Sequence, residues 1–154
     1  MTMKTLVSLL LAVALLLSTA CAEQARDLGY DANANATQLV EAAKREAAKS
    51  GRRVLIIAGG DWCRWCHVLD EFLSDNADAK AAMDASFVVV KVYVDDDTYD
   101  ESFFDRMPEA QGYPHMWVLM PYGGVKSIPT APLEQGDDDY DKGRFMAMLQ
   151  EAAQ

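Results

Sequence analysis

The sequence predicts an α/β domain in which a mixed central sheet of four to five strands carries helices on both faces. Two nearly continuous apolar runs, at 54–58 and 87–94, are typical of parallel strands that are covered on both sides. The segment between them has helical periodicity, which predicts a strand–helix–strand unit with a right-handed crossover. A third apolar run at 116–120, a tight turn and a short run at 125–128 predict an antiparallel hairpin.

The helices are predicted from capping residues and apolar spacing. The first is expected between the cap Thr37 and Gly51. A second follows the glycine pair 59–60 and begins near Cys63, and a third lies at the C-terminal end of the chain. The buried faces of these helices are expected to carry Val40, Ala43, Ala47, Leu69, Phe72, Leu73, Phe145, Leu149 and Ala152.

Residues 1–22 have the pattern of a secretory signal peptide. Their apolar run, 6–17, is too short for a membrane-spanning helix, which needs about 20 residues. The signal can end in two ways, because small residues fit cleavage after residue 22, whereas Cys21 fits a lipidated first residue. Residues 23–36 are small and polar and are predicted to form a flexible tether, and residues 37–154 are predicted to form one domain.

The composition describes a single soluble domain with an acidic surface. The chain has 154 residues, of which 51% are hydrophobic and 25% charged, and its net charge is −10 at pH 7. This acidity argues against binding to nucleic acid or to anionic membrane surfaces. We expect a monomer without a cofactor, because the sequence carries neither a dimerisation segment nor a cofactor motif.

Cys63 and Cys66 lie three positions apart at the predicted start of a helix, as reactive thiol pairs do. The unpaired backbone N–H groups and the dipole at that end of a helix favour a thiolate at Cys63. Free thiols have a pKa of ~8.5, and such pairs lower it to roughly 3.5–7.5. Arg64 adds a fixed positive charge, and Cys66 lies one turn deeper. Cys63 is therefore predicted to be the nucleophile and Cys66 the thiol that resolves mixed disulfides.

Other uses of the pair are a structural disulfide, a metal site or a purely docking domain. So short a disulfide loop stabilises a fold little, because the stabilisation grows with loop length. A zinc site needs four ligands, and the only further cysteine, Cys21, is removed or acylated. A soft-metal module stays as the alternative, in which Cys63, Cys66 and His115 hold copper for delivery. The intact cysteine pair argues against a domain that only docks other proteins.

Three motifs resemble the thioredoxin-fold family of thiol–disulfide oxidoreductases. The stretch 62–66, Trp-Cys-Arg-Trp-Cys, resembles the family's Trp-Cys-x-x-Cys, and 91–95 resembles its central-strand Lys-x-x-x-Asp. Pro114 precedes the apolar run 116–120, where the family has a cis-proline that faces the two sulfurs. The resemblance implies a thioredoxin-like three-layer fold with a redox disulfide between Cys63 and Cys66.

One departure from the family concerns proton transfer. Many members have a buried carboxylate six residues before the nucleophilic cysteine, where this chain has Ile57. The resemblance places Lys91 beneath the cysteine pair, where it would stabilise a thiolate more strongly without that carboxylate. The alternative is a lysine whose stem only extends to water.

Aromatic residues and a histidine are expected to support the site. Trp62 belongs to the motif, and Trp65 and Tyr113 are expected to flank the sulfurs and to offer apolar surface to an extended partner segment. His115 follows Pro114 directly and either points into solvent or lies near Cys63, where it would tune the charge of the thiol.

The sequence thus predicts an exported bacterial thiol–disulfide oxidoreductase, in the periplasm or on the outer face of a membrane. Its partners would be protein thiols and disulfides and a redox partner that recycles the cysteine pair, and a lipidated Cys21 would tether it. Reductase, oxidase and isomerase activities all stay open, because a difference of ~30 mV, or about 1.4 kcal/mol, changes the direction of exchange.

Overall fold

The computed structural model of the chain describes residues 27–97 and 99–154. Its centre is a four-stranded sheet in the order β2-β1-β3-β4. β1 (Arg53–Gly59) is parallel to β2 (Phe87–Tyr93) and antiparallel to β3 (His115–Leu119), which also pairs with β4 (Val125–Pro129). The mixed sheet is as predicted, but β2 lies at its edge rather than in its centre. An apolar run indicates that both faces of a strand are buried, but it does not indicate where the strand lies in the order of the sheet.

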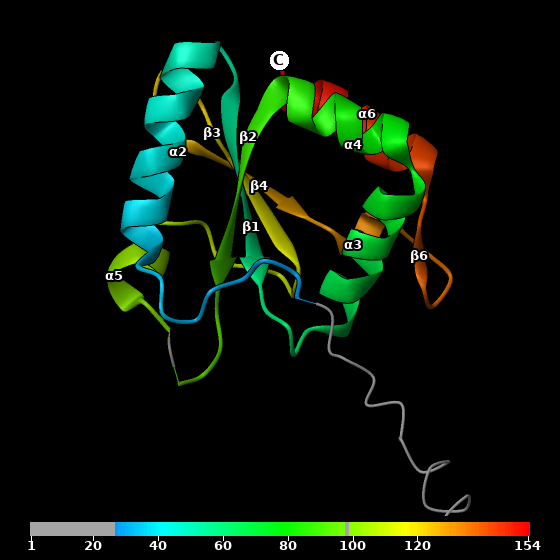
Figure 1. The fold of residues 1–154 in the computed structure, drawn as a ribbon, viewed down its shortest axis with the longest axis horizontal. Helices are drawn as coiled ribbons and strands as arrows, with labels where there is room; N and C mark the ends of the chain where they lie inside the picture. Colours follow the sequence, from blue (N-terminus) through cyan, green and yellow to red (C-terminus); the bar gives the residue numbers. More distant parts are fainter. Residues whose placement is uncertain (1–26, 98) are drawn as a thin grey trace, which may run out of the picture.

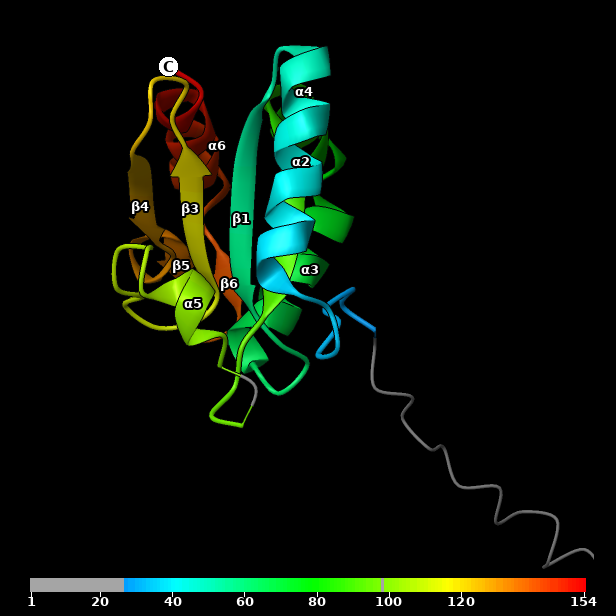
Figure 2. The ribbon, with the colours of Figure 1, turned by 90° about the vertical axis from the view of Figure 1, so that its left-hand side faces the viewer.

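Helices cover both faces of this sheet. α2 and α5 lie on one face, and α3, α4 and α6 lie on the other (Figures 1 and 2). The predicted thioredoxin-like three-layer arrangement is therefore confirmed. The remaining elements are α2 (Ala36–Ser50), α3 (Arg64–Asp75), α4 (Ala77–Ser86), α5 (Glu101–Phe104), η1 (Ala131–Leu133), β5 (Glu134–Gln135), β6 (Asp139–Tyr140) and α6 (Lys142–Ala152).

β1 separates two hydrophobic layers. Side chains alternate along a strand, so Ile56 joins the core beneath α2, whereas Leu55 and Ile57 join the core beneath α3 and α6. Leu55 and Ile56 have no exposed surface at all. The burial of both faces explains why the sequence of β1 is apolar throughout rather than alternating.

The cap of α2 lies two residues earlier than the sequence suggested. Asn35, and not Thr37, is the cap, because its side chain accepts a hydrogen bond from the backbone N–H of Gln38 at 2.9 Å. Gly51 ends the helix as predicted, with a φ of 71° that a glycine adopts without strain.

Leu28 and Tyr30 anchor the segment 27–30 on the domain, in contrast to the flexible tether predicted for 23–36. Leu28 is 2% exposed and Tyr30 is 8% exposed, and the backbone N–H of Leu28 donates to Oδ1 of Asp61 at 3.4 Å. The described part of the predicted tether therefore belongs to the domain, because burying two apolar side chains fixes it there. The predicted signal peptide and Cys21 lie outside the described residues. Of the helices in 27–97 and 99–154, none combines the length and apolarity needed to cross a membrane.

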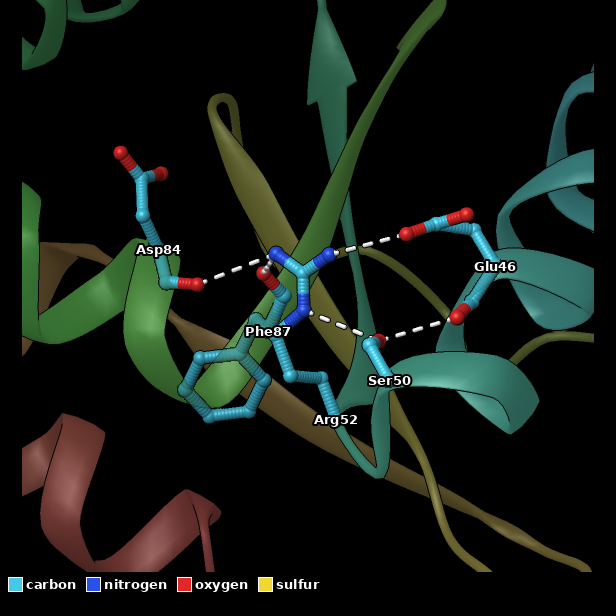
Figure 3. A network of polar contacts seen from close by, with 5 residues as sticks. All are labelled: Glu46, Ser50, Arg52, Asp84 and Phe87. Carbon is cyan, nitrogen blue, oxygen red and sulfur yellow. Dashed lines mark hydrogen bonds and ion pairs between the residues drawn. The ribbon is translucent and has the colours of Figure 1, made fainter.

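Arg52 joins three elements at the end of the sheet where β1 begins (Figure 3). Its guanidinium donates to the backbone oxygen of Asp84 at 3.1 Å and to that of Phe87 at 3.3 Å, where α4 turns into β2. The same side chain reaches Oγ of Ser50 at 3.0 Å and Oε1 of Glu46 at 3.3 Å on α2. The planar fork of an arginine suits such a junction, because one side chain serves several acceptors at once.

Candidate active site

The two cysteines lie where β1 ends and α3 begins. Cys63 is the N-cap of α3, and its Sγ accepts a hydrogen bond from the backbone N–H of Cys66 at 3.1 Å. The backbone N–H of Cys63 donates to the carbonyl of Gly60 at 3.0 Å, which closes the turn before the helix. The two sulfurs are bonded to each other, and the two Cα atoms are 5.2 Å apart. A helix terminus thus faces the sulfur of Cys63, as a stabilised thiolate requires.

Exposure does not distinguish the two cysteines, although the sequence suggested that Cys63 lies at an exposed helix start. Both are 3% exposed. Their surroundings differ instead: Sγ of Cys63 occupies the cap position, whereas Sγ of Cys66 lies against the backbone of Gly59, at the end of β1. The environment of the sulfur, rather than its accessible area, distinguishes the two cysteines.

The aromatic residues around the pair form two contacts. The Trp62 ring is 52% exposed, meets the Tyr113 ring edge to face at 5.6 Å, and donates from Nε1 to the carbonyl of Val94 at 2.8 Å. Trp65 packs on Tyr140 at 5.4 Å, and the Arg64 guanidinium lies 5.8 Å from the centre of the Trp65 ring. Trp65 and Tyr113 both pack against the cysteine cluster, as expected. Trp62 offers the larger exposed apolar surface.

The Tyr113–Pro114 peptide bond is cis. Pro114 comes just before β3, and its carbonyl accepts a hydrogen bond from Oγ1 of Thr130 at 2.6 Å. Tyr113 packs against the cluster that contains Cys63 and Cys66. The loop before β3 therefore lies beside the cysteine pair.

Leu28 and Tyr30 also surround the cysteines, and sequence reasoning missed them. Both belong to the small buried cluster that holds Cys63 and Cys66. Their segment reads Asp-Leu-Gly-Tyr-Asp, in which two large apolar side chains alternate with polar or small residues. That alternation was the sequence signal for burial, because solvated tethers contain few large apolar or aromatic residues.

A groove of about 810 Å³ opens beside Cys66, between α3, α4, β2 and the segment 27–30. Apolar side chains form most of its floor, with charged groups of both signs along it. Its lining includes Tyr30, Ile57, Cys66, Asp70, Met83 and Lys91. The groove brings Lys91 and the second cysteine to the same space.

Comparison with known proteins agrees with this geometry. Residues 35–121, more than half of the chain, match the sequence model of a family described as thioredoxin-like. The chain belongs to the thioredoxin-like family. A solved structure of a disulphide isomerase from Xylella fastidiosa Temecula1 shares the family's fold, with a TM-score of 0.67 and 20% identity over 82% of this chain and 97% of that chain. No match was found among curated proteins.

Lys91 lies on β2 directly opposite Ile57 of β1, and it lines the same groove as Cys66. Its ammonium contacts the carbonyl of Leu28, lies 3.6 Å from Oδ1 of Asp70 and is 5.3 Å from the centre of the Tyr30 ring. Ile57 itself is 1% exposed. The carboxylate nearest Lys91 in this family member thus comes from α3, four residues after Cys66, and not from β1.

Neither position expected for His115 is found. Its ring is fully buried and packs on Trp117, on the α2 side of the sheet, whereas the cysteines belong to α3 on the other side. Nδ1 accepts from the backbone N–H of Gln111 at 3.2 Å, and Nε2 lies 2.8 Å from Oγ of Ser127. The copper site with His115 is not formed, and within residues 27–97 and 99–154 no three His, Cys, Asp or Glu side chains are placed to hold a metal ion.

The buried imidazole should make stability depend on pH. Burial lowers the pKa of His115 below its usual value of 6.5, and protonation of Nδ1 would break the bond from Gln111. Below about pH 6.5 the unfolded chain therefore binds the proton more readily than the folded one, and stability falls as pH falls. The check is urea unfolding of the wild type and of His115→Gln at intervals between about pH 8 and about pH 5. Equal slopes against pH for the two proteins would contradict this role.

Proposed function

We propose that this thioredoxin-like chain is an exported thiol–disulfide oxidoreductase that exchanges disulfides with other proteins. The observation that carries the proposal is the position of Cys63 at the N-terminus of α3, bonded to Cys66 and beside the exposed Trp62. A helix terminus stabilises a thiolate there, and the thiolate is the attacking species in disulfide exchange.

The exchange proceeds in two balanced steps. The Cys63 thiolate attacks one sulfur of a partner disulfide, forms a mixed disulfide and expels the other partner sulfur as a thiolate. The Cys66 thiolate then attacks Sγ of Cys63, the bond between the proteins breaks, and the second partner sulfur leaves as a thiolate. The partner disulfide is reduced by two electrons while the Cys63–Cys66 pair is oxidised. The reverse sequence oxidises a partner dithiol.

The surface beside the pair suits an extended protein segment. Trp62 and Tyr113 form an aromatic edge next to the cysteines, and the loop of Pro114 lies beside them. Aromatic side chains with one polar group, such as the indole and phenol here, are common where proteins dock.

An exchange assay tests the activity. We expect the reduced chain to reduce a disulfide-bonded model protein and the oxidised chain to oxidise a reduced one, since the same pair serves both directions. The matched control replaces both cysteines, Cys63→Ser with Cys66→Ser, and keeps the fold. Equal rates for the wild type and this double variant would overturn the proposed activity.

Export is proposed from the sequence of residues 1–22, which has a signal pattern and ends near Cys21. An oxidising compartment outside the cytoplasm would give the pair disulfide substrates and would require a partner that recycles it. Fractionation of bacteria that produce the full chain, with Cys21→Ser as the comparison, tests export and acylation separately. A chain found only in the cytoplasm would contradict export.

A further inference from the structure

The sulfur of Cys66 shares a narrow space with the hydroxyl of Tyr30. A β-carbon placed on Gly59 would lie 2.4 Å from Sγ of Cys66 and 3.1 Å from Oη of Tyr30. The sulfur and the hydroxyl thus both lie beside Gly59. The distance between them cannot exceed the sum of these two distances. Tyr30 is 8% exposed and belongs to the cluster of the two cysteines.

A buried thiolate needs a hydrogen-bond donor, because desolvation otherwise favours the neutral thiol. In this chain Ile57 is the β1 residue that lines the groove with Cys66, and its side chain offers no donor. Burial raises the pKa of Tyr30 above its usual value, so its hydroxyl keeps its proton and can donate. Tyr30 is therefore a neutral donor beside the sulfur that has to lose a proton.

Charged groups face this space from each element around it. Lys91 on β2 is paired with Asp70 on α3 at 3.6 Å, and its ammonium is 5.3 Å from the centre of the Tyr30 ring. The charged and titratable groups in or near this cluster and groove are Asp61, Cys63, Arg64, His67, Asp70, Lys80, Asp84, Lys91, Tyr93, Tyr113 and Tyr140. Asp70 offsets part of the positive charge that Lys91 presents to the groove.

We infer that Tyr30 is the hydrogen-bond donor that holds Cys66 as a thiolate in the reduced protein, and that the Asp70–Lys91 pair sets the charge this thiolate meets. The inference rests on the proposed function, in which Cys66 attacks the mixed disulfide. The Cys66 thiol loses its proton to water in the groove, and the thiolate accepts the hydrogen bond from Tyr30 Oη. The thiolate then forms the bond to Sγ of Cys63 as the Cys63–partner bond breaks and the partner leaves as a thiolate.

The test measures ionisation of Cys66 alone, in the full chain carrying Cys21→Ser and Cys63→Ala. Alkylation rate and ultraviolet thiolate absorbance are followed against pH. We expect Tyr30→Phe to raise the pH midpoint by about one unit, a tenfold lower thiolate fraction near neutral pH, because a hydrogen bond to a charged group is lost. The matched control is Tyr122→Phe, which removes the hydroxyl of a fully exposed ring outside the groove and should leave the midpoint unchanged. An unchanged midpoint in Tyr30→Phe, or an equal rise in Tyr122→Phe, would overturn the inference.

A second variant should shift the pH midpoint of Cys66 in the opposite direction. Asp70→Asn removes the negative charge that offsets Lys91, so the Cys66 midpoint should fall. This result is required even if Tyr30→Phe fails to fold: a midpoint that stays or rises in Asp70→Asn would show that Cys66 does not sense this pair and would overturn the inference.

A kinetic readout separates this inference from the proposed function. With both cysteines present, Tyr30→Phe should lengthen the life of a mixed disulfide about threefold, because the greater nucleophilicity of a more basic thiolate offsets part of its tenfold lower amount. If the wild type exchanges no disulfides, the proposed function fails while the midpoint shift still decides the role of Tyr30. If the wild type exchanges them and the midpoint does not move, the inference alone fails.

Discussion

Cys66→Ser is expected to accumulate a mixed disulfide with a disulfide-bonded model protein, and Cys63→Ser is not. Sγ of Cys63 is the cap of α3 and accepts a backbone N–H, whereas Sγ of Cys66 lies against Gly59. The thiolate fraction of a thiol of pKa ~8.5 is a few per cent at neutral pH, and a helix terminus can raise it about tenfold. We therefore expect roughly tenfold more trapped complex for Cys66→Ser at equal times. Acid quenching followed by non-reducing electrophoresis and mass spectrometry measures it.

All trapping variants also carry Cys21→Ser, so that Cys63 and Cys66 are the only thiols tested, and the control that replaces both of these should yield no covalent complex. Adding dithiothreitol must release the complex formed by Cys66→Ser, which shows that a disulfide holds it. Equal trapping by the two single variants would mean that the helix terminus does not select Cys63, and the assignment of nucleophile and resolving thiol would fail.

The layers of the fold were predictable because their signals are local. β1 is buried on both faces, and its residues 54–58 are apolar without interruption for that reason. The hairpin of β3 and β4 followed from a turn rich in Gly and Pro between two apolar runs. The position of β2 at the edge was not predictable, because strand order depends on which strands meet in three dimensions.

The cysteine pair was found from its spacing, but the groups around Cys66 were not. Leu28 and Tyr30 lie more than 30 residues before Cys63 in a segment that is mostly polar and small. Their burial is a tertiary effect, since each becomes apolar core only by packing against α3 and the cysteines. The average composition of 23–36 is small and polar, so it does not reveal that two residues within this segment are buried.

The surroundings of His115 and Lys91 also depend on tertiary structure, and the sequence alone did not predict them. A strand alternates faces, so a shift of one residue decides whether His115 and Trp117 together face the α2 side or the side of the cysteines, and the sequence alone does not set that register. For Lys91, the absence of a carboxylate at Ile57 could be read from the sequence, but the carboxylate that does pair with the lysine could not. Asp70 of α3 supplies this carboxylate. A single acidic residue within a helix has no sequence pattern that marks it as the partner of a distant lysine.

Gly59→Ala is expected to make the Cys63–Cys66 disulfide less stable. The new β-carbon would lie 2.4 Å from Sγ of Cys66, closer than real contacts of a β-carbon, and 3.1 Å from Oη of Tyr30, which is a tight contact. In the oxidised protein the sulfur is bonded to Cys63 and cannot rotate away, whereas the free thiol can adopt another rotamer. We expect a cost of about 2 kcal/mol in the oxidised form, as overpacking of a core typically gives.

The expected result for Gly59→Ala is therefore a more oxidising pair as well as a less stable fold. If the 2 kcal/mol applies only to the oxidised form, the reduction potential rises by about 40 mV. Equilibration with glutathione buffers measures the potential, and urea unfolding of the oxidised and reduced forms measures the two stabilities. Gly143→Ala is the matched control, because it also has an ordinary φ, its β-carbon would meet only Oδ1 of Asp141 at 3.3 Å, and it lies in α6 away from the cysteines. An equal loss of stability in the oxidised and reduced forms of Gly59→Ala, with no change in potential, would show that the new methyl group acts on Tyr30 or the backbone and not on the sulfur of Cys66.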